Sequence, residues 1–341
     1  MNSLFNTFAK KLFAASCAIF VLGMTLIVVA FSMEDEEVDP SYQKYFNENY
    51  KIFSLNTPDN IAFAGEEVPL QILDVREKLD RELLVNTYWQ SQSLLFHKRA
   101  NRWFPVIEPI LEKNGVPDDF KYLAVIESGL TNVVSPAGAT GYWQLLKHTG
   151  REYGLEINNE VDERYHVEKS TEAACKYLKD AYKIYGSWTL AAASYNMGMT
   201  GLNRQIERQQ VFNYYDLLLN EETGRYLYRI LALKEILGKP SLYGFHFRPK
   251  DLYTTYEVEE VMVDTAVDNF ADFAEQQEIN YKILKILNPW LREAFITNPK
   301  NKAYLIKIPI DKTAGLVPFE PAPKQISVSD SLSGDTIIID Q

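Results

Sequence analysis

A helical spacing of apolar residues over positions 71–238 restricts the fold of this 341-residue chain more than any other feature. The run "TEAACKYLKDAYKIYG" has apolar residues three or four positions apart, follows Ser170 as an expected N-cap, and stops at Gly186. The same spacing recurs at Ile72, Val75, Leu79 and Leu83, and again at Tyr226, Ile230, Leu233 and Leu237. Such stripes are typical of helices that bury one face. We therefore predict an all-helical domain over residues 71–250.

The pattern changes after residue 250. The segments "YTTYEVEEVMV" and "KAYLIKIPI" have the composition of short strands, and "VDNFADFAEQQE" and "NYKILKILNP" between them have that of two short helices. This order predicts a small α+β module, strand-helix-helix-strand, over residues 251–312. Residues 313–341 are proline-rich and then polar, which predicts a mobile tail. The expected fold class is mainly α with this small second module.

The first 33 residues are expected to direct the chain to a membrane. Lys10 and Lys11 precede the uncharged run "LFAASCAIFVLGMTLIVVAFSM", which is long enough to cross a bilayer as a helix. Because positive flanks are retained in the cytoplasm, the rest of the chain is expected outside it. An uncleaved signal anchor and a signal peptide cleaved near Ala30 both fit. Residues 34–70 contain three prolines and are interpreted as a linker that partly packs on the following domain.

Composition excludes several classes of function. The net charge of −11 argues against a nucleic-acid partner, because such binding needs a basic surface. The four histidines lack the spacing of a metal site, and there is no phosphate-binding glycine-rich loop, so no metal and no cofactor are expected. Cys175, in a helical pattern, is expected to be a small core residue.

One glutamate interrupts an apolar helical run in "PDDFKYLAVIESGL". Its stripe begins at Phe120, Leu123 and Ala124, and the next position on the stripe, i+7 from Phe120, is Glu127. A buried carboxyl group must either find a cation or keep its proton through a raised pKa. A raised pKa near neutrality suits a general acid. A structural ion pair or a capping role fits the spacing equally well.

The sequence after Glu127 favours a sugar-binding groove. The stretch "SGLTNVVSPAGATGYWQLL" is expected to be a turn-rich loop that leads into a helix bearing Trp143 and Gln144. The run "SWTLAAASYNMG" predicts a helix that ends near Tyr195 and Asn196. Aromatic faces stack on sugar rings and amides bond their hydroxyl and acetamido groups, so these residue types near helix ends point to a glycan.

These motifs resemble the lysozyme-like (SLT-type) lytic transglycosylases of bacterial cell walls, in particular their membrane-bound type D branch. The resemblance rests on "ES" at Glu127, "SPAGATGYWQLL", "VDERYHVEKSTEAACKYLKDAY" and "ASYNMG", in that order. It implies a lysozyme-like helical domain and Glu127 as the catalytic acid and base. It also implies that Ser128, Gln144, Tyr195 and Asn196 bind the substrate and line its cleft.

The implied reaction is cleavage of the β-1,4 bond between N-acetylmuramic acid and N-acetylglucosamine in peptidoglycan. Glu127 protonates the glycosidic oxygen and then takes the proton of the muramyl C6 hydroxyl, which closes onto C1 as a 1,6-anhydro end. One carboxylate can suffice, whereas ordinary glycosidases use two. We expect Asp162 and Glu163 in "VDER" to be structural, through pairing with Arg164 or capping. A lysozyme-type hydrolase and a non-catalytic wall-binding protein are the alternatives.

The C-terminal module resembles a degenerate LysM module, a class that binds N-acetylglucosamine chains. The resemblance rests on the predicted order of its elements, on "LNPWL" and on the closing strand "AYLIKIP", while the usual opening Gly-Asp-Thr is absent. It implies either glycan binding or a purely structural docking role. The expected partners of the whole chain are thus peptidoglycan strands and, through the N-terminal segment, the cell membrane.

Overall fold

The computed structural model describes residues 40–49 and 52–313 and divides the chain into two units between Ser54 and Leu55. In the first unit, residues 40–49 form a helix that begins at Pro40, where the missing amide hydrogen costs no helical bond. The predicted membrane segment at 1–33 lies outside the described residues, as does the predicted tail from residue 314 onward. None of the helices within the described part of the chain is long and apolar enough to span a bilayer.

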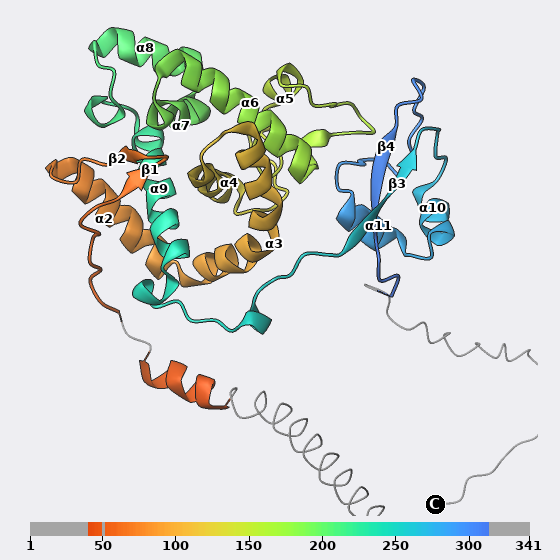
Figure 1. Ribbon diagram of the computed structural model, residues 1–341, viewed down its shortest axis with the longest axis horizontal. Coiled ribbons are helices and arrows are strands. Elements are labelled where there is room, and N and C mark those ends of the chain that lie inside the picture. The colour runs from red at the N-terminus through yellow and green to blue at the C-terminus, as the bar shows by residue number, and fades with distance from the viewer. Residues whose placement is uncertain (1–39, 50–51, 314–341) are drawn as a thin grey trace, which may run out of the picture. The chain divides into compact units, whose positions relative to one another are not determined.

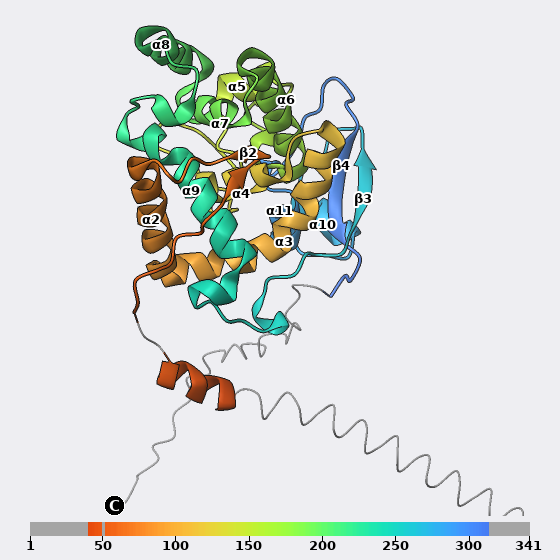
Figure 2. The same ribbon diagram turned by 60° about the vertical axis from the view of Figure 1, so that its left-hand side comes forward.

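Helices make up most of the second unit, which confirms the predicted mainly α class (Figure 1). Helix α4 lies at the centre, with α2, α3, α6 and α9 arranged around it in both ribbon views (Figures 1 and 2). One hydrophobic core joins these helices. The helices are α2 (Leu73–Tyr88), α3 (Gln90–Asn114), α4 (Lys121–Ser128), α5 (Lys147–Glu152), α6 (Val167–Tyr185), α7 (Trp188–Met197), α8 (Met199–Gln209) and α9 (Glu221–Gly238).

Part of the segment predicted as a linker packs on this domain, as expected. Strands β1 (Ala62–Phe63) and β2 (Glu66–Glu67) pair antiparallel. The buried ring of Phe63 meets that of Phe120 edge to face, with centroids 5.0 Å apart. The Glu66 carboxylate accepts hydrogen bonds from the Ser187 hydroxyl (2.9 Å) and the Thr189 amide (3.0 Å), so it satisfies free donors at the start of α7.

Helix α6 differs from its prediction at one end. It begins at Val167, and the expected N-cap Ser170 lies within its first turn. The reason is that the buried Ser170 hydroxyl donates back to the carbonyl of His166 (2.8 Å) and does not accept from an amide. The end at Gly186 is as predicted, with a left-handed φ of 64°. Cys175 on this helix is fully buried, which confirms its predicted core position.

The C-terminal module has the predicted strand-helix-helix-strand order. Strands β3 (Val258–Val263) and β4 (Tyr304–Pro309) pair antiparallel, with Val258 opposite Pro309 and Val263 opposite Tyr304. Helices α10 (Phe270–Gln276) and α11 (Tyr281–Leu287) pack together, and α11 packs on β4. The module has a hydrophobic core separate from that of the helical domain.

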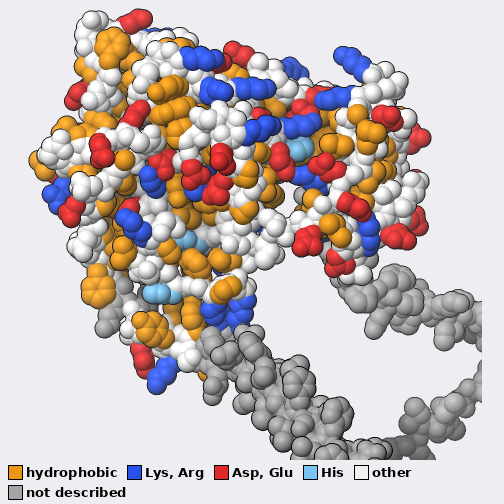
Figure 3. Space-filling view, in the orientation of Figure 1, with side chains coloured by type: hydrophobic (Ala, Val, Ile, Leu, Met, Phe, Trp, Pro, Cys, Tyr) orange, Lys and Arg blue, Asp and Glu red, His pale blue; other side chains and the backbone are white. Residues whose placement is uncertain are grey.

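Charged side chains of both signs are mixed on the face of the molecule drawn in Figure 3. Several charged residues form ion pairs with a neighbour on the same helix. Lys183 pairs with Asp180 on α6 (2.7 Å), and Lys78 pairs with Asp74 on α2 (2.9 Å). On this face, mixed charges of this kind give a polyanion no continuous basic surface to bind.

Candidate active site

Helix α4 presents Glu127 from an otherwise apolar face. The helix follows a short 3-10 turn at Asp118–Phe120 and ends at Gly129, which takes a left-handed φ of 62°. Phe120, Leu123 and Ala124 are fully buried on the predicted stripe. Glu127 continues that stripe and is half-buried. The sequence therefore located correctly the side of the helix from which the carboxyl group projects.

A tyrosine is the hydrogen-bond partner of this carboxyl group. The Tyr226 hydroxyl on α9 donates to Glu127 Oε1, and Tyr226 itself is only 2% exposed. Over residues 40–49 and 52–313, no Lys or Arg nitrogen lies within ion-pair distance of Glu127. Its partner is thus a neutral donor, which stabilises the carboxylate less than a cation does.

Burial controls the protonation of Glu127. Burial raises the pKa of Glu127 to about 7, although the hydrogen bond from Tyr226 and the positive charge of Arg229 act to lower it. The negative charge of Glu222 acts in the same direction as burial. Near neutral pH this carboxyl group therefore holds its proton about half of the time, as a group that alternates between acid and base requires.

The α4–α5 loop, residues 129–146, is tied to the residues around Glu127. The Ser128 hydroxyl donates to the carbonyl of Tyr142 (2.8 Å) and also lies 3.1 Å from that of Ala124. The Tyr195 hydroxyl on α7 donates to the carbonyl of Trp143 (2.7 Å). Burial, followed by the charge of Glu127, raises the pKa of Tyr195 well above its usual value, so Tyr195 remains a donor. Ser128 and Tyr195 therefore fix the loop beside Glu127.

The predicted helix bearing Trp143 and Gln144 is wrong. These residues form the end of a tight turn, in which Thr140 bridges to both Val134 and Leu145 and helix α5 starts only at Lys147. Gln144 has a left-handed φ of 47°, which a helix does not allow. Its side-chain amide donates to the carbonyls of Val133 (3.0 Å) and Gly141 (2.8 Å). The amide nitrogen of Gln144 therefore stabilises the turn itself.

Asn196 joins the end of α7 to the start of α9. Its amide donates to Glu222 Oε1 (3.2 Å), and its oxygen accepts from the hydroxyl of Thr223 (2.7 Å). Because Glu222 also acts on the charge of Glu127, Asn196 belongs to the same neighbourhood. The structure thus brings Ser128, Tyr195 and Asn196 around Glu127, while Gln144 lies in the adjoining turn.

Tyr226 is the residue of this site that the sequence reasoning missed. It lies on the apolar stripe of α9 and was predicted only as part of the core. A signal was present three residues later, since Arg229 shares its helix face. A tyrosine and an arginine on one face of a buried helix suggest a polar partner on the helix opposite, but the spacing does not identify which one.

A pocket of about 300 Å³ adjoins the site and is lined by Glu221, Glu222, Arg225 and Arg229. Arg229 donates to the carbonyl of Ile126 (3.3 Å), one residue before Glu127. Glu222 and Arg229 line this pocket, and the charges of both act on the Glu127 carboxyl group. It offers charged and hydrogen-bonding groups to a polar ligand.

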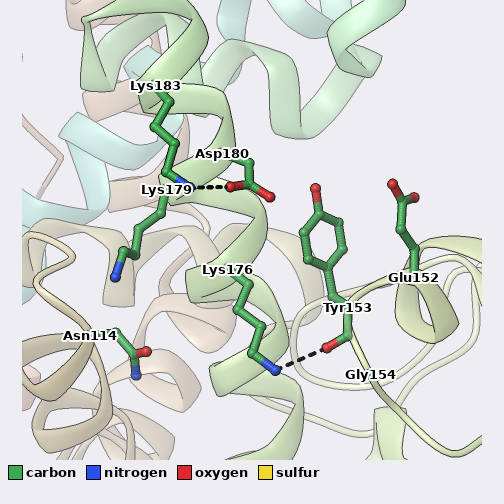
Figure 4. A pocket seen from close by; sticks show the side chains of 8 residues that line it. All are labelled: Asn114, Glu152, Tyr153, Gly154, Lys176, Lys179, Asp180 and Lys183. Atoms are coloured by element: carbon green, nitrogen blue, oxygen red, sulfur yellow. Dashed lines mark hydrogen bonds and ion pairs between the residues drawn. The ribbon is translucent and has the colours of Figure 1, made fainter.

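A larger pocket, about 490 Å³, lies along α6 and has a different character (Figure 4). Lys183 pairs there with Asp180 (2.7 Å), and Lys176 donates to the carbonyl of Tyr153 (3.3 Å). Two of its three lysines are thus paired with a carboxylate or bonded to backbone, as on a solvated helix face. Within the residues that the structure describes, no cluster of His, Cys, Asp or Glu could hold a metal ion.

Two family models match parts of the chain. Residues 105–218 match the transglycosylase SLT domain, and residues 259–312 match the soluble lytic transglycosylase C-terminal LysM-like domain. The predicted resemblance to SLT-type lytic transglycosylases with a LysM-like module is therefore confirmed for both domains.

Two curated relatives support the same assignment. Proteins named membrane-bound lytic murein transglycosylase D, from Escherichia coli strain K12 and from Escherichia coli O6:H1, are each 30% identical to this chain over 199 residues. The alignments cover 56% of this chain and 43% of each relative. The chain therefore spans less than half the length of these relatives.

Proposed function

We propose that this chain, which carries an SLT domain, is a peptidoglycan lytic transglycosylase that leaves 1,6-anhydro-muramyl ends. The observation that carries the proposal is the environment of Glu127. Its carboxyl group is half-buried, bonded to the neutral Tyr226 hydroxyl and held at a pKa of about 7. The match to the SLT domain and the names of the relatives supply the substrate class, a murein glycan strand.

In the proposed first step, protonated Glu127 donates its proton to the glycosidic oxygen between N-acetylmuramic acid and N-acetylglucosamine. The bond from that oxygen to C1 of the muramyl residue breaks, and the positive charge is shared by C1 and the ring oxygen. Glu127, now a carboxylate, keeps the hydrogen bond from Tyr226. A neutral donor suits both the protonated and the ionised form of Glu127. Its hydrogen bond stabilises the carboxylate, but not so strongly that the carboxyl group cannot take up a proton again.

In the proposed second step, the Glu127 carboxylate takes the proton of the muramyl C6 hydroxyl, whose oxygen bonds to C1. The glutamate ends in its starting state, and no water is consumed. Ser128, Tyr195 and Asn196 keep the surrounding loop and helix ends in place through the hydrogen bonds described above. Gln144 is proposed to contribute by setting the turn of the α4–α5 loop.

A lysozyme-type hydrolase is the second candidate, and Glu222 is the observation that favours it. Its negative charge acts on Glu127, so the site has a second carboxylate of the kind that hydrolases use. However, Glu222 is exposed and accepts a hydrogen bond from Asn196, which argues for a positioning role.

Mass spectrometry of digested murein sacculi tests this proposal. A lytic transglycosylase releases muropeptides that are lighter by one water than the reducing products of a hydrolase. Anhydro products that disappear in Glu127→Gln and persist in Glu222→Gln support the proposed mechanism. Reducing products, or murein release that Glu127→Gln leaves unchanged, contradict it.

We also propose that the protein acts in the periplasm, held at the membrane by residues 1–33. The uncharged run after Lys11 supports this proposal, as does the name of the E. coli relatives, which describes them as membrane-bound. Cell fractionation combined with the mass of the mature chain distinguishes the two expected forms. An intact N-terminus in the membrane fraction indicates an anchor, and a chain shortened near Ala30 indicates a cleaved signal peptide.

A further inference from the structure

One segment of the helical domain, residues 155–168, is partly enclosed by the C-terminal module; it is called the bridging segment below. Val161 is 1% exposed and belongs to the hydrophobic core of the module, where it forms a β-bridge with Leu291. The amide of Asp162 donates to the carbonyl of Trp290 (2.9 Å), and the amide of Arg292 donates to the carbonyl of Glu160 (2.7 Å). The module thus holds the bridging segment through both apolar and backbone contacts.

Within the bridging segment, Asp162 and Arg164 form a buried, two-pronged ion pair. Arg164 Nε lies 2.9 Å from Asp162 Oδ1, and Nη2 lies 2.7 Å from Oδ2. Asp162 is 7% exposed and Arg164 is 8% exposed. The pairing was predicted from the sequence and is confirmed. Because both prongs are used, the guanidinium plane has one orientation with respect to the carboxylate.

The remaining nitrogen of Arg164 reaches the α4–α5 loop. Nη1 donates to the carbonyls of Gly138 (3.0 Å) and Leu145 (3.2 Å), which lie near the two ends of the turn. Between them, Gly141 packs so closely that a Cβ atom there would lie 1.9 Å from the carbonyl oxygen of Arg164. Arg164 therefore holds the loop at carbonyls other than those that bond Ser128 and Tyr195.

We propose that Arg164 is a positioning residue for the Glu127 site, and that the C-terminal module acts through Asp162 to hold Arg164 in place. The route is continuous: the module binds the backbone of Asp162, its carboxylate orients Arg164, and Arg164 fixes the loop whose carbonyls bond Ser128 and Tyr195. The module then contributes to catalysis by stiffening the site, with or without any contact to glycan. This inference rests on the proposed function.

Energetics favour a positioning role over a purely stabilising one. A buried ion pair repays little more than the cost of removing its charges from water, so stability alone is a weak reason for one. What this pair adds is a fixed orientation of the guanidinium group, which places Arg164 Nη1 against the carbonyls of Gly138 and Leu145. Placement errors of about 1 Å at a catalytic group can lower rates by about a hundredfold.

Asp162→Asn in the full chain is the first test, because it keeps the size of the side chain and removes its charge. The matched control is Asp251→Asn, since Asp251 makes the same two-pronged pair with Arg248 (2.9 and 3.0 Å) outside the α4–α5 loop. Rates are measured on soluble glycan strands over a range of concentration and pH, alongside thermal unfolding. We expect kcat to fall about tenfold or more in Asp162→Asn and to stay within about twofold of wild type in the control.

The pH profile separates positioning from simple loss of folded protein. A looser loop admits water to Glu127, so its raised pKa falls and the high-pH limb of the rate moves to lower pH. Unfolded molecules contribute no rate and cannot move that limb. If Asp162→Asn has no measurable rate, Arg164→Lys is used, because it keeps the charge and loses the fork. The inference is overturned if the tested variant has the same high-pH limb as wild type and a kcat like that of Asp251→Asn. Absence of glycan cleavage by the wild type overturns the proposed function instead.

Discussion

Glu127, which is half-buried, and Glu163, which is buried, are two glutamates of the same helical domain whose pKa values shift in opposite directions. Burial acts to raise the pKa of both residues. At Glu163, the hydrogen bond from Lys169, the amide of Glu156 and the nearby charge of Lys302 outweigh burial, and the net pKa is lowered. At Glu127, the Tyr226 hydroxyl and the more distant Arg229 do not outweigh it, and the pKa rises to about 7.

The difference shows that cationic partners can outweigh burial, and so decide whether a carboxyl group in the interior can work as an acid. Glu163 is only 3% exposed, yet it is held as a carboxylate by cations. Glu127 is more exposed but has a neutral partner and keeps a proton. Depth of burial alone would not have singled out Glu127, because Glu82 (1% exposed) and Glu163 (3% exposed) are both more deeply buried.

Removing the carboxyl group from each residue gives the largest expected contrast. We expect Glu127→Gln to lower murein release by about 10²–10⁴-fold, because an amide can neither donate nor accept the catalytic proton. Glu163→Gln is the matched control, with the same substitution at a more deeply buried site, and should retain most of its activity per folded molecule. Initial rates on purified sacculi, corrected for the folded fraction, measure both. Equal losses in the two variants would contradict the assignment of Glu127.

The same Glu127→Gln variant should be more stable than wild type at alkaline pH. With a folded pKa of about 7 against an ordinary glutamate pKa of 4.5, the wild-type carboxyl group holds its proton more firmly when folded. Stability is therefore lost as the pH rises from about 4.5 to 7, by at most about 3 kcal/mol. Urea unfolding at pH 8 and at pH 4 measures the free energy of unfolding of both proteins. Glu127→Gln should be more stable than wild type at pH 8, and the difference should be absent at pH 4.

Glu163→Gln should destabilise the fold, by about 1–3 kcal/mol at pH 7. It removes the negative charge that pairs with Lys169 and weakens the contact with Lys302 of the C-terminal module. Because the folded pKa of Glu163 is lowered, its contribution is present above the ordinary glutamate pKa of 4.5 and is lost as the pH falls through the lowered folded pKa. The gap between wild type and variant in urea unfolding should accordingly narrow in acid. A gap that widens in acid is the result that this account does not allow.

Tyr226→Phe should have the smallest effect and the most specific one. The Tyr226 hydrogen bond lowers the pKa of Glu127, so its loss should raise that pKa above 7 and move the high-pH limb of murein release to higher pH. The cost in rate should be about tenfold, equivalent to one charge-assisted hydrogen bond of about 1.5 kcal/mol. Tyr228→Phe, two residues along α9, is the matched control and should leave the limb in place. A limb that moves down in Tyr226→Phe would refute the donor role.

Local spacing was enough to find Glu127 but not its partner. The i+7 relation to Phe120 fixes the face of α4 whatever the rest of the fold does. Tyr226 lies 99 residues further along the chain, and only the packing of α9 on α4 brings it to the carboxyl group. Contacts of this kind depend on tertiary structure, which a helical pattern does not contain.

Trp143 and Gln144 illustrate the opposite failure. Their apolar and polar spacing was compatible with a helix, but the backbone takes left-handed values at Gly141 and Gln144. Gln144 tolerates its value because its own amide bonds the turn. The pairing of Asp162 with Arg164 was predictable because both residues lie in one short segment, whereas their link to the module was not.

The close approach of Gly141 to the bridging segment also has a use in comparing other sequences with this one. Because a methyl group at this position would overlap a backbone oxygen, no single substitution there can be accommodated without moving the bridging segment. A related sequence with any other residue at the position of Gly141 must have changed the path of its bridging segment as well. The residue at the position of Gly141 thus distinguishes relatives in which the bridging segment can pack on the α4–α5 loop as it does here from relatives that must position their glutamate in another way.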